Sequence, residues 1–272
     1  MLTRRLDGIV SKVAFCEVSM MQKQYKLIIS YDGTGYAGWI QQPDEPSIVQ
    51  TLQDAFARVF SKPIRLLGAS KTDAGVHAYG QVAVFKTDLE IDPEKMRWAW
   101  NNGLPESITI RSLEHDDDFY PHGNVLRKTY QYDLFLDRPL PFVSRYGIQV
   151  YGEVDWDLFE KALTLFEGTH NFQAFYTGDD RDDTQRIIES IRLDRSDPLR
   201  YRVVVIGKSF LRHMVRRIIG AALAAAQRET ILLDDITHAL QTGKTNCQLP
   251  TAPAKGLMLW DIEYEIKKTM RG

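Results

Sequence analysis

Residues 68–82 read GASKTDAGVHAYGQV, and the rest of the chain is organised around this stretch. It lies between a segment with helical apolar spacing, 48–61, and a segment with strand-like alternation, 81–86. The stretch has no apolar periodicity of its own, and it contains three glycines and a Thr-Asp pair. This composition predicts a tight connecting loop.

Asp73 is the candidate for chemistry in this loop. Its side chain either caps its own backbone or presents a carboxylate, with Lys71 two residues before it and His77 four residues after it. A phosphate-binding loop is a competing interpretation of the Ser-Lys-Thr sequence. It is excluded because that motif requires a glycine directly before the lysine, where Ser70 stands.

Apolar spacing and caps predict an α+β fold. Asp92-Pro93 and Asp155 are typical helix starts, and Ser47 with Gln50 predicts a capping box. Strands are expected at 24–32, 81–86, 107–113, 130–136, 187–194, 201–206 and 257–266, and helices at 48–61, 92–103, 156–167, 211–227 and 234–242. Strand–helix–strand units recur in both halves, so we expect two related halves that share a mostly antiparallel sheet, with a central cleft as the site.

Three segments are expected along the chain. Residues 1–20 are expected to be a loose N-terminal tail, and Met20-Met21 is an alternative start of translation. Residues 21–118 form an N-terminal α+β half with the Asp73 loop, and residues 119–272 form a C-terminal half with a basic helix.

Composition excludes several classes of protein. The chain has 272 residues, a formal net charge of −2 and two cysteines, Cys16 and Cys247, which are too few for a disulfide scaffold. Cysteine usage therefore favours a reducing cytosol and a cytoplasmic location. The longest apolar run, 218–226, is far shorter than the roughly 20 residues of a membrane span. The scattered histidines and cysteines predict no metal site.

A local excess of basic residues contrasts with the overall charge. Residues 198–228 contain no Asp or Glu. The cations of this stretch are Arg200, Arg202, Lys208, Arg212, Arg216, Arg217 and Arg228. The stretch is either a helix with a basic polar face or a track for the phosphates of a nucleic acid.

Several motifs together resemble the tRNA pseudouridine synthase A family. They are Lys71-Thr-Asp-Ala-Gly-Val-His77, Tyr31-Asp-Gly33 with Gly38-Trp39, Asp117 to Tyr130, Lys208 to Gly220, and Ala252-Pro-Ala-Lys-Gly-Leu257. The resemblance covers about residues 25–265. The family usually has arginine where Lys71 stands, glutamine where Ile40 stands and arginine where His122 stands.

The resemblance implies a pseudouridine synthase fold and an isomerase that needs no cofactor and no metal. It implies tRNA as the partner, flipped-out uridines 38, 39 and 40 of the anticodon stem-loop as targets, and a homodimer. Asp73 would be the nucleophile, with Arg216 beside its carboxylate. Substrate-binding residues would be Tyr130, which stacks on the target base, Lys71, Leu257 and His77, and RNA-backbone residues would be Arg212, Arg217, Lys208, Arg127 and Lys128.

Two other functions remain as alternatives. A non-catalytic RNA-binding module would use the basic stretch and the aromatic residues, with Asp73 as a turn residue. A glycosidase would need a second carboxylate about 5–9 Å from the first, and none stands near the loop in the sequence. A binding module has no need of the Asp73 loop, Tyr130 and Arg216 together, which favours the synthase.

Overall fold

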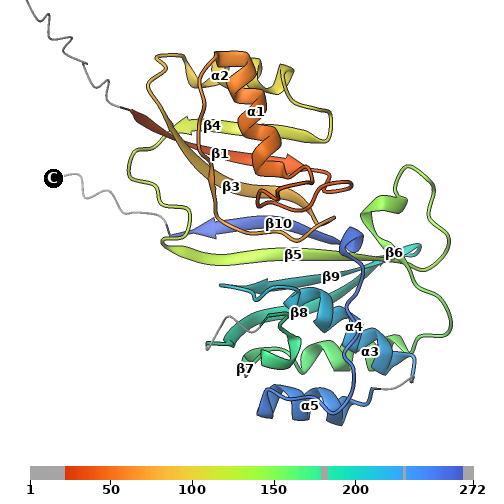
Figure 1. The fold of residues 1–272 in the computed structure, drawn as a ribbon. Coiled ribbons are helices and arrows are strands. Elements are labelled where there is room, and N and C mark those ends of the chain that lie inside the picture. Colours follow the sequence, from red (N-terminus) through yellow and green to blue (C-terminus); the bar gives the residue numbers. More distant parts are fainter. Residues whose placement is uncertain (1–21, 179–182, 229–230, 266–272) are drawn as a thin grey trace, which may run out of the picture.

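The computed structural model describes residues 22–178, 183–228 and 231–265. The predicted loose tail at residues 1–20 lies outside the described residues. Figure 1 shows one continuous sheet, with α1 and α2 beside the strands of the N-terminal half and α3, α4 and α5 beside those of the C-terminal half. No helix in the described ranges is long and apolar enough to cross a membrane.

The sheet has ten strands in the order β4-β1-β3-β10-β5-β9-β8-β7, with β2 paired to β3 and β6 paired to β5. The strands are β1 Lys23–Tyr31, β2 Leu67–Gly68, β3 His77–Thr87, β4 Ile108–His115, β5 Val125–Phe135, β6 Ile148–Gln149, β7 Gly168–Asn171, β8 Gln185–Asp197, β9 Arg200–Gly207 and β10 Leu257–Tyr264. The helices are α1 Ile48–Phe60, α2 Pro93–Asn102, α3 Trp156–Thr164, α4 Met214–Ala226 and α5 Leu233–Thr242, with short 3₁₀ turns η1 Ser144–Tyr146, η2 Gln173–Phe175 and η3 Ala254–Gly256. Two strand pairs are parallel, β10 with β3 and β5 with β6, and the others are antiparallel. The predicted α+β fold with a mostly antiparallel sheet is therefore confirmed.

The last strand joins the two halves. β10 pairs antiparallel with β5, and it pairs parallel with β3 over a short register in which Met258 faces His77 and Leu259 faces Ala78. The C-terminal strand therefore lies directly beside the strand that follows the Asp73 loop, and it brings Leu257 to the middle of the molecule.

Helix α1 shows how the local sequence makes an element of the N-terminal half. Ser47 accepts a hydrogen bond from the backbone N–H of Gln50, and Ile48, Leu52 and Phe56 are fully buried on one face. The predicted capping box is only half formed, because the Gln50 side chain donates to Asp54 instead of returning to the cap.

The connecting loop is shorter than predicted. β3 begins at His77 instead of Gln81, and β2 already ends at Gly68, so the loop proper spans 69–76. The basic helix α4 begins at Met214, three residues later than predicted, because Leu211–His213 form the turn that leads into it. β7 carried no strand-like alternation and was not predicted.

Candidate active site

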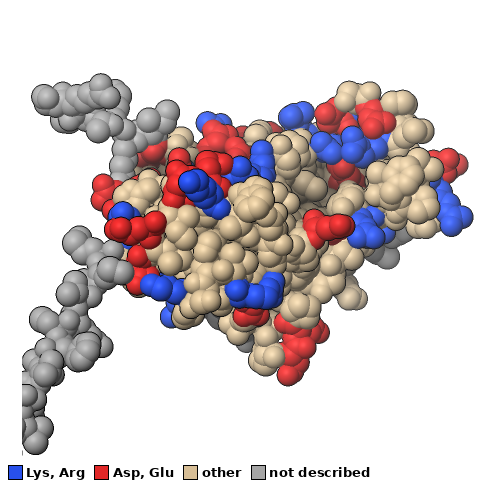
Figure 2. Space-filling model, turned by 90° about the horizontal axis from the view of Figure 1, so that it is seen from above, with Lys and Arg blue, Asp and Glu red and all other residues tan. Residues whose placement is uncertain are grey.

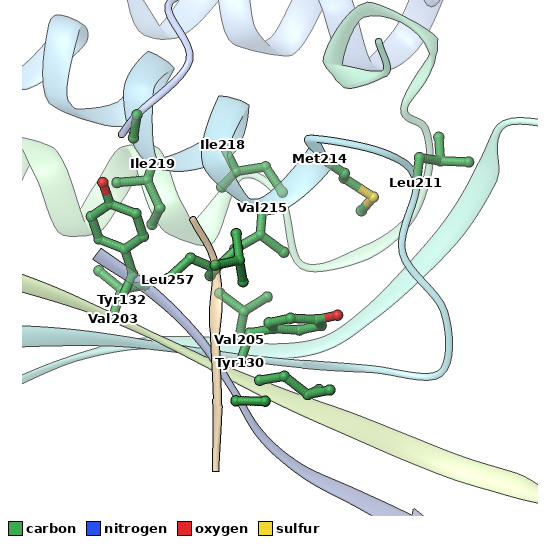
Figure 3. Packing of buried hydrophobic residues seen from close by; sticks show 14 of the residues in the cluster. Tyr130, Tyr132, Val203, Val205, Leu211, Met214, Val215, Ile218, Ile219 and Leu257 are labelled. Carbon is green, nitrogen blue, oxygen red and sulfur yellow. The ribbon is translucent and has the colours of Figure 1, made fainter. Parts of the chain in front are cut away.

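A cavity of about 890 Å³ opens between the two halves. Most of its wall comes from the loop 69–76, strand β5, residues 210–216 at the start of α4, and Leu257 at the start of β10. Residues of the 37–42 turn, His122 and the 176–178 segment complete it. Figure 3 shows the ring of Tyr130 on the strand side, facing the first turn of α4. Segments more than 180 residues apart along the chain, such as those of Asp73 and Leu257, therefore form one site.

The Asp73 carboxylate lines this cavity beside two side chains of the α4 segment. Its Oδ2 atom lies 3.5 Å from Nη1 of Arg216 and 3.7 Å from Nε2 of His213. Its side chain is 17% exposed, so the charge interactions act in a partly desolvated site. The nearby guanidinium attracts the carboxylate and holds it at the cavity wall.

Arg216 is fixed by its own backbone neighbours. Its Nε donates to the carbonyl of Ala252 at 2.8 Å, and its carbonyl accepts a hydrogen bond from the Ala252 N–H at 3.0 Å. These two bonds connect α4 to the segment that leads into β10. They leave Nη1 directed at Asp73.

The loop is held in place by buried polar groups. The fully buried Gln81 side chain accepts from the N–H of Ser70 at 3.2 Å and donates to the Ser70 carbonyl at 2.7 Å. The Thr72 hydroxyl lies 2.7 Å from the Tyr31 hydroxyl, and the Thr72 carbonyl accepts from the N–H of Trp39. The residues on both sides of Lys71 are thus anchored, which fixes the direction of Asp73.

Glycine is required where the 31–39 turn touches the loop. A Cβ on Gly38 would lie 2.5 Å from the Thr72 carbonyl oxygen, and its φ of +98° is unfavourable for other residues. This close approach accounts for the glycine directly before Trp39.

Tyr130 presents an aromatic ring to the cavity while its hydroxyl is satisfied. The hydroxyl lies 3.0 Å from the Ser70 hydroxyl, and the ring packs edge-to-face with Phe210 at 5.1 Å. Burial raises the pKa of Tyr130 to about 12, so the phenol is neutral at physiological pH. A neutral aromatic wall is a suitable surface for stacking a base.

Lys128 contacts the loop from strand β5. Its Nζ donates to the carbonyl of Ala69 at 2.8 Å, and burial lowers the pKa of this amine to about 8. Lys128 also lines the cavity. Its predicted role as an RNA-backbone contact therefore competes with a role in fixing the loop.

The other predicted residues either line the cavity or lie outside its wall. Lys71 and Arg212 are exposed and line the cavity, and Leu257 is a buried part of its wall. Lys208 is exposed next to the segment that forms the cavity. Arg127 pairs with Glu263 at 3.2 Å and Arg217 donates to the Ala174 carbonyl at 3.0 Å, and neither lines the cavity.

His77 is not positioned to bind a substrate, contrary to the expectation. Its ring is 1% exposed and is absent from the cavity wall. Nδ1 lies 3.0 Å from the N–H of Gly33, and Nε2 lies 2.9 Å from the carbonyl of Arg145. The physical reason is that β3 starts at this residue, which turns the ring into the packed junction between the halves.

Sequence analysis missed three residues of this site. His213 stands inside the quoted Lys208 to Gly220 motif, so a signal was present. Ser70 and Gln81 carried none, because their roles depend on buried hydrogen bonds between a loop and a strand.

The two signs of charge mix on one face of the molecule (Figure 2). Figure 2 shows Lys and Arg interspersed with Asp and Glu on the face seen from above the view of Figure 1. That face has no uniform positive field, in keeping with the net charge of −2. Binding of a polyanion would therefore depend on the local cations around the cavity.

Comparison with known proteins places this chain in a family. A family model described as tRNA pseudouridine synthase matches residues 27–122 and 162–265. The chain is 33% identical over 253 residues to the tRNA pseudouridine synthase A of Thermodesulfovibrio yellowstonii, which covers 88% of this chain and 98% of the relative. The proteins of the same name from Acetivibrio thermocellus and Geobacillus sp. are each 34% identical, covering 89% and 90% of this chain and the whole of each relative. The chain therefore belongs to the tRNA pseudouridine synthase family and is an isomerase.

Proposed function

We propose that this protein isomerises uridine to pseudouridine at positions 38, 39 and 40 of the tRNA anticodon stem-loop, with Asp73 as the nucleophile. The observation that carries the proposal is the Asp73 carboxylate in the wall of a cavity, 3.5 Å from Arg216. The three target positions rest on the resemblance of the motifs to the tRNA pseudouridine synthase A family.

The reaction exchanges one bond for another without a redox step. The C1′–N1 bond of uridine breaks, the base turns, and a C1′–C5 bond forms. A carboxylate beside C1′ stabilises the electron-poor sugar carbon or bonds to it for a time, as in retaining glycosidases. Arg216 supports this role because its guanidinium lies 3.5 Å from the carboxylate and orients it.

The target base has to leave the stack to reach Asp73, which costs a few kcal/mol. Stacking on the Tyr130 ring offsets this by roughly 1–3 kcal/mol. Leu257 supplies an apolar contact on the cavity wall. Exposed Lys71 at the same cavity is available to enter the vacated space or to contact a phosphate.

Backbone phosphates would be bound by the cations next to the cavity. Arg212 and Lys208 are the exposed candidates, and their contribution should make tRNA affinity fall as salt rises. The resemblance also leads us to propose a cytoplasmic homodimer. In such a C2 dimer one subunit can orient the tRNA while the other reacts.

The test is tritium release from tRNA that carries 5-tritiated uridine, measured with the wild type, Asp73→Asn and the control Asp54→Asn. Asp54 is an exposed residue of α1, outside the cavity. The proposal expects release by the wild type and by Asp54→Asn, and none by Asp73→Asn although that variant still binds tRNA. If the wild type binds tRNA without releasing tritium, the chain is a non-catalytic RNA-binding module.

A further inference from the structure

We propose that His213 is the base that accepts the proton from C5 of the isomerising uracil and returns a proton to N1. This inference rests on the proposed function of the Asp73 cavity and adds a second catalytic residue to it. It concerns the removal of the C5 proton, a step for which Asp73, as the nucleophile at the sugar, is not assigned.

The chemistry defines where this base has to lie. After the C1′–C5 bond has formed, C5 still carries its hydrogen. The C5–H bond then breaks, its electron pair restores the C5=C6 double bond, and N1 gains a proton, so the atoms balance without any co-reactant. Because C5 is then bonded to C1′, the acceptor has to lie beside the carboxylate that acts on C1′.

His213 meets this requirement of position. Its ring lines the cavity, and its Nε2 lies 3.7 Å from Oδ2 of Asp73. Arg216 lies slightly closer to Asp73, at 3.5 Å, but a guanidinium stays protonated in proteins and cannot accept a proton.

The other titratable residues of the wall are less suited. The Tyr130 hydroxyl is hydrogen-bonded to Ser70, and its pKa of about 12 keeps it protonated. Lys128 is bound through its Nζ to the Ala69 carbonyl. His122 also lines the cavity, but its ring packs edge-to-face with Tyr120 at 5.6 Å between centroids, and among the described residues it forms no ion pair with Asp73. It serves below as the matched control.

The backbone at His213 is strained. His213 has φ +63° and ψ 0°, a left-handed conformation that is uncommon for a residue other than glycine. It stands at the N-cap of α4, yet its side chain makes no capping hydrogen bond. The His213 side chain therefore does not cap the helix, and it lies in the cavity wall although its backbone is strained. Backbone strain of this kind is typical of functional residues.

The charges around the ring suit a base that works late in the reaction. Burial lowers the pKa of His213, and Arg216, Arg212 and Arg217 lower it further, so the ring starts neutral. Asp73 acts in the opposite direction and raises this pKa. When Asp73 leaves C1′ as a free carboxylate, it favours the protonated ring at the moment when the C5 proton has to be accepted.

The experiment is single-turnover isomerisation of tRNA with hydrogen or deuterium at C5 of uridine. His213→Asn and His213→Gly are the variants, since both residues tolerate the left-handed backbone, and His122→Asn is the control. Loss of the base should lower the rate by on the order of 100-fold. It should also make C5–H cleavage rate-limiting, so the isotope effect should rise above that of the wild type in both variants and stay unchanged in His122→Asn.

Added imidazole should restore the rate of His213→Gly, because the variant leaves space for the free base. Thermal unfolding of each variant checks that the fold is retained. A lower rate with the wild-type isotope effect and no imidazole rescue would assign His213 a structural role and overturn the inference. An inactive wild type, or an active Asp73→Asn, would instead overturn the proposed function.

Discussion

Replacement of Gln81 by leucine tests whether its side chain fixes the Asp73 loop. The amide is fully buried and bonds both backbone groups of Ser70, at 3.2 Å to the N–H and 2.7 Å to the carbonyl. Leucine has a similar size but forms neither bond, so Gln81→Leu leaves a donor and an acceptor of the loop buried without a partner.

The expected loss of stability follows from these two unpaired backbone groups of Ser70. Each buried backbone group that loses its partner costs about 1–3 kcal/mol, which gives about 2–6 kcal/mol for Gln81→Leu. Gln53→Leu is the matched control, because the Gln53 side chain accepts one backbone hydrogen bond, from the N–H of Leu66 at 2.9 Å. Its expected cost is about 1–3 kcal/mol, at a position outside the cavity.

Urea unfolding of the two variants measures these free energies, and single-turnover tritium release measures the effect on chemistry. We expect Gln81→Leu to lose about twice the stability that Gln53→Leu loses. Only Gln81→Leu should react more slowly on saturating tRNA, because its loop no longer directs Asp73. Equal losses of stability, or an unchanged rate in folded Gln81→Leu, would refute the role given to this side chain.

Two further predictions concern the same carboxylate. Arg216→Ala should lower turnover of bound tRNA more than it lowers tRNA affinity, because it removes the charge 3.5 Å from Asp73. Filter binding measures the affinity and single-turnover kinetics measure the turnover. A larger loss of affinity than of turnover would make Arg216 a phosphate contact. Gly38→Ala should slow the reaction at least tenfold, because its Cβ would lie 2.5 Å from the Thr72 carbonyl. Gly35→Ala is the control: it has a similar positive φ but open space around it, so it should react at the wild-type rate. Equal rates in these two variants would show that the close approach of Gly38 to Thr72 does not position the Asp73 loop.

The sequence by itself determined the main elements and the identity of the Asp73 loop. Apolar spacing and the caps Ser47, Asp92 and Asp155 depend on neighbours within a few residues, so helices α1, α2 and α3 could be predicted from them. The motif around Asp73 is equally local. The start of β3 at His77 was missed because pairing with β1 and β10, rather than local propensity, extends this strand.

The tertiary structure alone decided what surrounds Asp73. Arg216 stands 143 residues later in the chain, and its 3.5 Å distance from Asp73 depends on β10 lying between β3 and β5. The same sheet order buries His77 and places Gln81 and Lys128 against the loop. Such contacts follow from strand order and packing between distant segments, which a single sequence does not encode in any local pattern.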